Sequence, residues 1–124
     1  PRRGRPVAVM MLCIPGLAAD TVEQMYSIID TLMAAMPSGS YLMIADGTDI
    51  SARGVASTQQ AQQMGLHYRL RSPQQLARCL RGLDMLEPGL GSVNHWRPDP
   101  ADADIDCYGD GKPVDCYGAL ARKR

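Results

Sequence analysis

The sequence predicts an α/β fold built on a parallel sheet, and three observations lead to this prediction. Residues 7–14 and 40–45 are nearly continuous apolar runs, which is typical of strands buried on both faces. A segment with helical periodicity lies between them. A strand, a crossover helix and a second strand form a βαβ unit, whose strands are parallel. Such sheets usually bind a ligand at the carboxyl ends of their strands.

Length and charge limit the possible function classes. The 124 residues suffice for one domain, and we expect residues 1–124 to form a single unit. Thirteen basic residues balance thirteen acidic ones, which indicates neither a nucleic-acid nor a membrane partner. The longest apolar run is shorter than the roughly 20 residues that span a bilayer. The arginines before it also suit a signal peptide, but the capped helix that follows favours a cytoplasmic protein.

The first helix is predicted to begin at Asp20, where Glu23 completes a capping box. Its apolar residues recur at steps of three and four and form one face: Val22, Met25, Ile29, Leu32 and Met36. Pro37 and Gly39 end this helix before the strand over residues 40–45. Residues 46–49 are predicted to form a turn at the carboxyl end of that strand.

The second half of the chain adds two helices and two strands. Residues 51–64 predict a solvated outer helix, because glutamines make one side of it polar. Ser72 is a predicted N-cap, with Pro73 at the first helical position and Gln75 completing a capping box. We expect a short strand over residues 83–87, a loop-rich segment over 91–103 and a last strand over 114–121.

The cysteines and histidines predict no metal site. Cys107 and Cys116 lie in two copies of the phrase Asp-Cys-Tyr-Gly, so a hairpin would allow a disulfide, whereas free cytosolic thiols are the favoured alternative. His67 and His95 have no ligand-like spacing from the cysteines. The acidic stretch over residues 102–106 lacks the glycine and glutamate pattern of an EF-hand.

Several phrases in order resemble one enzyme class. The phrase Pro37-Ser38-Gly39-Ser40-Tyr41-Leu42-Met43-Ile44 resembles the entry to the fifth strand of class I S-adenosylmethionine-dependent methyltransferases. Residues 71–78 and 82–89 resemble that fold's next capped helix and its sixth strand. Residues 6–11, 96–99 and 117–123 resemble one little-characterised bacterial methyltransferase family. The resemblance implies the C-terminal half of a Rossmann-like sheet, with strands 4, 5, 6 and 7 in the order 4-5-7-6 and flanking helices.

The chain departs from this family's pattern after the first strand. The family continues with Leu-His-Phe, whereas Gly16 stands here at the histidine position and cannot accept a proton or orient a substrate. The family's first half supplies the glycine-rich turn and the acidic residue that hold the cofactor, and nothing in this sequence replaces them. We therefore assign no catalytic residue and expect the chain alone to be inactive.

The resemblance nevertheless implies site residues and partners. The cofactor would be S-adenosylmethionine, with Leu12, Cys13 and Ile14 lining its adenosine or methyl side. Asp46 and Thr48, after the next strand, would face the substrate, although Asp46 equally suits a turn. An apolar strand at the edge of a sheet tends to pair with another chain. We therefore expect the edge over residues 7–14 to pair with a missing N-terminal half or with a second copy.

Three functions remain open from the sequence. The favoured one is S-adenosylmethionine-dependent methyl transfer to an unknown acceptor, with this chain supplying the C-terminal half. The second is a degenerate, non-catalytic interaction or dimerisation module on the same scaffold, which Gly16 favours. The third is an unrelated α/β binding domain that shares only the order of strands and helices.

Overall fold

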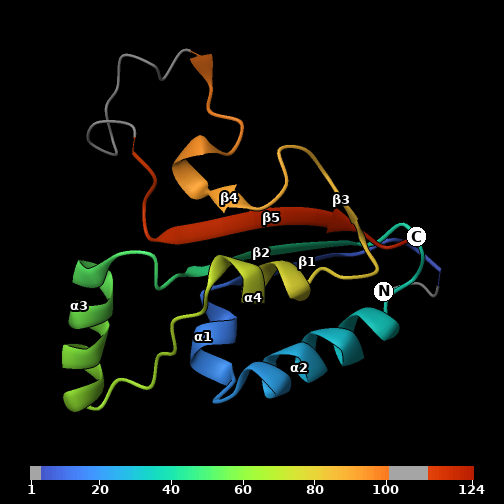
Figure 1. Cartoon of the computed structure of the whole chain (residues 1–124). Helices are drawn as coiled ribbons and strands as arrows, with labels where there is room; N and C mark the ends of the chain where they lie inside the picture. Colours follow the sequence, from blue (N-terminus) through green and yellow to red (C-terminus); the bar gives the residue numbers. More distant parts are fainter. Residues whose placement is uncertain (1–3, 101–111) are drawn as a thin grey trace.

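The computed structural model describes residues 4–100 and 112–124 (Figure 1). In chain order, the elements are β1 (Ala8–Leu12), α1 (Ile14–Ala18), α2 (Val22–Ala34), β2 (Tyr41–Gly47), α3 (Ala52–Gln63), α4 (Pro73–Arg78), β3 (Asp84–Met85), β4 (Gly91–Ser92), the 3-10 helix η1 (Val93–His95) and β5 (Cys116–Arg122). This mixed α/β architecture confirms the predicted fold class. Cys107 and the acidic stretch over residues 102–106 lie outside the described residues.

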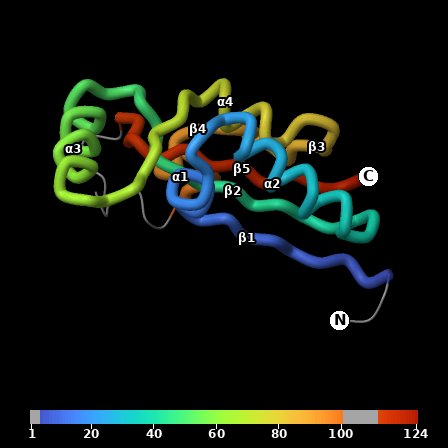
Figure 2. Tube along the Cα trace, turned by 90° about the horizontal axis from the view of Figure 1, so that it is seen from below, coloured from blue at the N-terminus to red at the C-terminus, as the bar shows by residue number. Residues whose placement is uncertain are grey.

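The strands form one sheet in the order β1-β2-β5-β3, with β4 also paired to β5. β1 and β2 are parallel because α2 returns the chain across the sheet between them. β5 is antiparallel to β2, β3 and β4. The last strand of the chain therefore inserts between the second and third, which is the predicted 4-5-7-6 order. β1 forms the outer margin of the described sheet (Figure 2).

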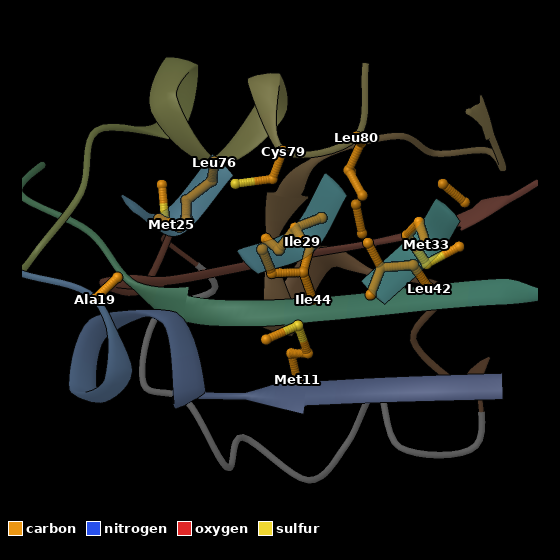
Figure 3. Close-up of a cluster of buried hydrophobic side chains, with 12 residues drawn as sticks. Met11, Ala19, Met25, Ile29, Met33, Leu42, Ile44, Leu76, Cys79 and Leu80 are labelled. Atoms are coloured by element: carbon orange, nitrogen blue, oxygen red, sulfur yellow. The ribbon is translucent and has the colours of Figure 1, made fainter. Parts of the chain in front are cut away.

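One face of the sheet packs against α2 and α4 and forms the core (Figure 3). Side chains alternate along β2, so Leu42 and Ile44 point into this core and are fully buried. From α2, Met25 and Ile29 are 1% exposed, and from α4 Leu76 has no exposed surface. The 3.6-residue period predicted for α2 thus identifies its buried side.

Local signals place most helix ends closely, but α2 ends at Ala34, two residues before the predicted Met36. Ser72 and Gln75 form the predicted capping box of α4. The outer helix α3 contains no buried residue, as its polar sequence predicts. The predicted start of α2 at Asp20 is wrong by one residue, because the Thr21 hydroxyl accepts the Gln24 N–H and makes Thr21 the N-cap.

Several strand ends differ from the sequence prediction. β3 covers only Asp84–Met85 of the expected residues 83–87, and β5 begins at Cys116 instead of residue 114. β1 stops at Leu12 instead of residue 14, because Cys13 adopts a left-handed conformation (φ 61°) and the chain enters α1 at Ile14. β2 continues to Gly47 instead of turning at Asp46, because β5 pairs with it as far as Gly47. The short strand β4 within the predicted loop is likewise formed by pairing with β5. For β2 and β4, pairing with the distant strand β5 therefore overrides the local turn and loop signals.

Candidate functional site at the carboxyl ends of β1 and β2

The parallel strands β1 and β2 end together at one edge of the sheet. Leu12 pairs with Ala45, and the Cys13 N–H donates to the Ala45 carbonyl at 2.7 Å. Leu12 is 48% exposed and Ile14 is 44% exposed, while Cys13 between them is also exposed. We call these three residues, 12–14, the β1 lip. The sequence-predicted cofactor residues therefore form one exposed, mostly apolar segment where α/β sheets bind ligands.

Asp46 lies beside the lip but points into the protein, and it has no exposed surface. Its Oδ2 accepts the Gly16 N–H at 2.8 Å, and its Oδ1 accepts the Gly47 N–H at 2.9 Å. The Tyr68 hydroxyl also donates to Oδ1. A buried carboxylate is stable only when its oxygens accept hydrogen bonds, and these three donors supply them. Asp46 thus joins β2 to α1 and to the segment before α4.

Tyr68 is a site residue that the sequence analysis missed. Its hydroxyl donates to Asp46 and accepts the Gly47 N–H at 3.0 Å. Burial raises the pKa of the Tyr68 phenol above its ordinary value, and the bond to the Asp46 carboxylate raises it further. The phenol therefore stays protonated at neutral pH and acts as a donor. No local sequence pattern marks Tyr68, because its partners belong to β2 and α1.

The structure explains why residue 16 is a glycine. Gly16 is buried, and a Cβ added there would lie 2.6 Å from Tyr68 Cζ and 2.8 Å from Tyr68 Cε2. It would also approach the Arg69 carbonyl oxygen to 3.0 Å. The Tyr68 ring therefore occupies the space that a side chain at position 16 would fill.

Thr48, the other predicted substrate residue, is also fully buried. Its N–H and its hydroxyl both donate to the Asp115 carbonyl, at 2.6 and 2.8 Å. The Ser51 hydroxyl donates to the Asp115 carboxylate at 2.9 Å, which joins the start of α3 to the residue before β5. Asp46 and Thr48 thus lie at the predicted strand end, and their contact with substrate stays a prediction.

The segment before α4 also bonds to the backbone of α1, through the Arg71 side chain and the Arg69 N–H. The Arg71 side chain is 4% exposed, and its Nη2 donates to the Ala19 carbonyl at 2.7 Å. The Arg69 N–H donates to the Gly16 carbonyl at 2.9 Å. Residues 68–71 therefore contact the middle and the C-terminal end of α1, which begins at the last residue of the β1 lip.

The cysteines and histidines offer no metal centre within residues 4–100 and 112–124, where no three candidate ligands cluster. Cys13 is exposed, while burial raises the pKa of the Cys79 thiol to about 11. Burial also raises the pKa of the Cys116 thiol. Cys116 is a free thiol, and its predicted alternative partner, Cys107, lies outside the described residues.

A cleft of about 300 Å³ lies beside the β4–β5 pair. Its walls include His95, Trp96 and Tyr117, and the Trp96 indole N–H donates to the Gly89 carbonyl at 3.0 Å. Tyr117 pairs with Asp46 on one side and with Ser92 on the other. The cleft and the β1 lip therefore lie at the same end of the sheet. None of the helices in the described part of the chain is long and apolar enough to cross a membrane.

Comparison with known proteins agrees with this architecture. The sequence profile of the S-adenosyl methyltransferase family matches residues 3–124. The crystal structure of a DUF574 family protein from Streptomyces avermitilis is 30% identical, with a TM-score of 0.82 over 97% of this chain and 45% of that one. A candidate methyltransferase from Thermobifida fusca shares the fold at 19% identity, with a TM-score of 0.77 over 100% of this chain and 46% of that one.

The chain thus spans about half the length of these two solved structures. No curated protein matches it. The match of the family profile to nearly the whole sequence, together with the β1-β2-β5-β3 sheet, decides the assignment. The chain belongs to the S-adenosyl methyltransferase family.

Proposed function

We propose that the chain provides the strand 4 to strand 7 half of an S-adenosylmethionine-dependent methyltransferase. The observation that carries this proposal is the sheet order β1-β2-β5-β3 with an antiparallel β5, in a chain that the family profile covers over residues 3–124. That order leaves β1 as the strand at which the other half of such a sheet would join. The acceptor of the methyl group stays open.

The β1 lip suits the apolar side of S-adenosylmethionine. Leu12 and Ile14 present exposed aliphatic side chains at the carboxyl end of a parallel strand, where they would cover part of the nucleoside and exclude water. The cofactor, when bound, supplies an electrophilic methyl group on a sulfonium. This chain would position the cofactor. Asp46 and Arg71 bond to the backbone of α1, and α1 in turn fixes the orientation of the lip that precedes it.

We propose that the free edge of β1 pairs with a strand from the family's N-terminal half. The two solved structures share only 45% and 46% of their own length with this chain, so each contains further chain of comparable size. On β1, Met10 is 60% exposed and Leu12 is 48% exposed, so this strand leaves two large apolar side chains uncovered. Without that half, the same edge would favour association between two copies.

Calorimetric titration with S-adenosylhomocysteine tests the proposal. We expect binding by a form extended upstream into the missing half and no measurable binding by this chain alone. Leu12→Asp in the extended form should weaken binding at least tenfold by placing a charge on the lip. Met85→Asp on β3 is the matched control, because Met85 is 40% exposed but lies at the opposite end of β5.

A second function is favoured by the residue at position 16 and by the hydrogen bonding of Asp46, whose carboxylate oxygens are already occupied by three donors. Gly16 has no side chain, and the raised pKa of Tyr68 keeps its phenol protonated. The alternative is therefore a non-catalytic interaction module on the same scaffold. Failure of both forms to bind S-adenosylhomocysteine, together with stable self-association, would support the module and contradict methyl transfer.

A further inference from the structure

Tyr68 and Gly16 are complementary in shape although they are far apart in the sequence. The Tyr68 ring lies where a side chain at position 16 would begin, and its Cζ is 2.6 Å from the point that a Cβ on residue 16 would occupy. The backbone on both sides is fixed, because the Arg69 N–H donates to the Gly16 carbonyl at 2.9 Å. From α3, the Gln62 side chain donates to the Tyr68 carbonyl at 2.5 Å. Hydrogen bonds to the backbone of residues 68 and 69 therefore fix the position of the Tyr68 ring.

The same ring brings a hydroxyl to a buried carboxylate. Asp46 has three donors, and Tyr68 supplies the only one from a side chain among the hydrogen bonds described for it. Because Asp46 also accepts the Gly16 N–H, the phenol and the α1 backbone share one acceptor group. Loss of one donor from a buried charge leaves it partly unsatisfied, so its other contacts must rearrange or admit water.

We propose that Tyr68 is a positioning residue of the methyl-transfer site, which acts through Asp46 and Gly16 to hold α1 and the β1 lip in place. The inference rests on the proposed function, because it takes the lip to be the cofactor side of the site. The Tyr68 ring fills the space that a side chain at position 16 would take. Tyr68 orients the segment that contacts the ligand and does not itself transfer a proton.

Amide hydrogen exchange tests the contact in this chain by itself. With ¹⁵N-glycine labelling, the Gly16 amide reports on its bond to Asp46, which the substitution reaches only through the carboxylate. The Gly47 amide reports on its bonds to both Asp46 and the Tyr68 hydroxyl. Tyr68→Phe keeps the ring and removes the hydroxyl, and we expect exchange at both amides to accelerate at least tenfold. Tyr26→Phe is the matched control, because the Tyr26 hydroxyl is buried without a hydrogen-bond partner. Unchanged exchange in Tyr68→Phe would overturn the inference.

Affinity for S-adenosylhomocysteine in the upstream-extended form separates positioning of the site from local stability. We expect Tyr68→Phe to weaken binding about tenfold and Tyr26→Phe to leave it unchanged. Faster exchange with unaltered affinity would overturn the role of Tyr68 in the site. If the unsubstituted extended form does not bind S-adenosylhomocysteine, the proposed function fails, and the assignment of Tyr68 to a methyl-transfer site fails with it. Amide exchange still tests the Tyr68–Asp46 contact in that case.

Discussion

Gly16→Ala is expected to lower the free energy of unfolding by about 1.5 to 5 kcal/mol. The new methyl group would lie 2.6 and 2.8 Å from two atoms of the Tyr68 ring, and overpacking of this kind costs about 1 to 3 kcal/mol. Moving the ring would also break its bond to the Asp46 carboxylate, a further ~1.5 to 3 kcal/mol. Alanine's better helix propensity within α1 offsets about 1 kcal/mol.

A double-mutant cycle isolates the contact between the two residues. In a Tyr68→Ala background the ring is absent, so Gly16→Ala should change stability by less than about 1 kcal/mol. The coupling energy should then be about 1.5 to 5 kcal/mol. Urea unfolding followed by circular dichroism measures all four proteins. Gly91→Ala is the control, since no atom lies within 4 Å of its added Cβ. Additivity within about 0.5 kcal/mol would refute the steric argument.

The remaining predictions concern the thiols, a helix cap and the sheet edge. At about pH 8, iodoacetamide should alkylate exposed Cys13 faster than Cys79, because burial raises the pKa of Cys79 to about 11. Peptide mass mapping measures both rates, and equal rates would contradict this prediction. Ser72→Ala should lower the free energy of unfolding by about 1 kcal/mol and Ser72→Gly by only a few tenths, as urea unfolding can test. Met10→Lys should convert assemblies of this chain into monomers in sedimentation, whereas Met85→Lys should not, and a monomeric unsubstituted chain would contradict the edge proposal.

The positions of α2, α3 and α4 were predictable from the sequence because their signals are local, whereas α1 was not predicted. A capping box needs only Ser72 and Gln75, and both contacts form as predicted. The buried face of α2 follows from residue spacing, and Met25 and Ile29 lie in the core. The N-cap shifts by one residue to Thr21 because Asp20 and Thr21 are both favourable N-cap residues, and local sequence does not distinguish them.

The site was less predictable because its contacts join distant segments. Asp46 and Thr48 were correctly placed at the end of a strand, but their burial depends on Tyr68 and on Asp115. Aspartate is common in turns, yet pairing with β5 keeps Asp46 in β2. A propensity scale cannot register a partner whose position depends on the rest of the fold.

The sequence alone determined the α/β class, the order of most elements and, through its resemblance to a family, the order of the strands. These follow from apolar runs, helical spacing and short caps, all of which act between near neighbours. Only the tertiary structure decided that Asp46 is buried under three donors and that Tyr68 fills the space over Gly16. The role of the buried Asp46 carboxylate and the need for glycine at position 16 both depend on the residues that pack against them. That packing exists only in the folded chain.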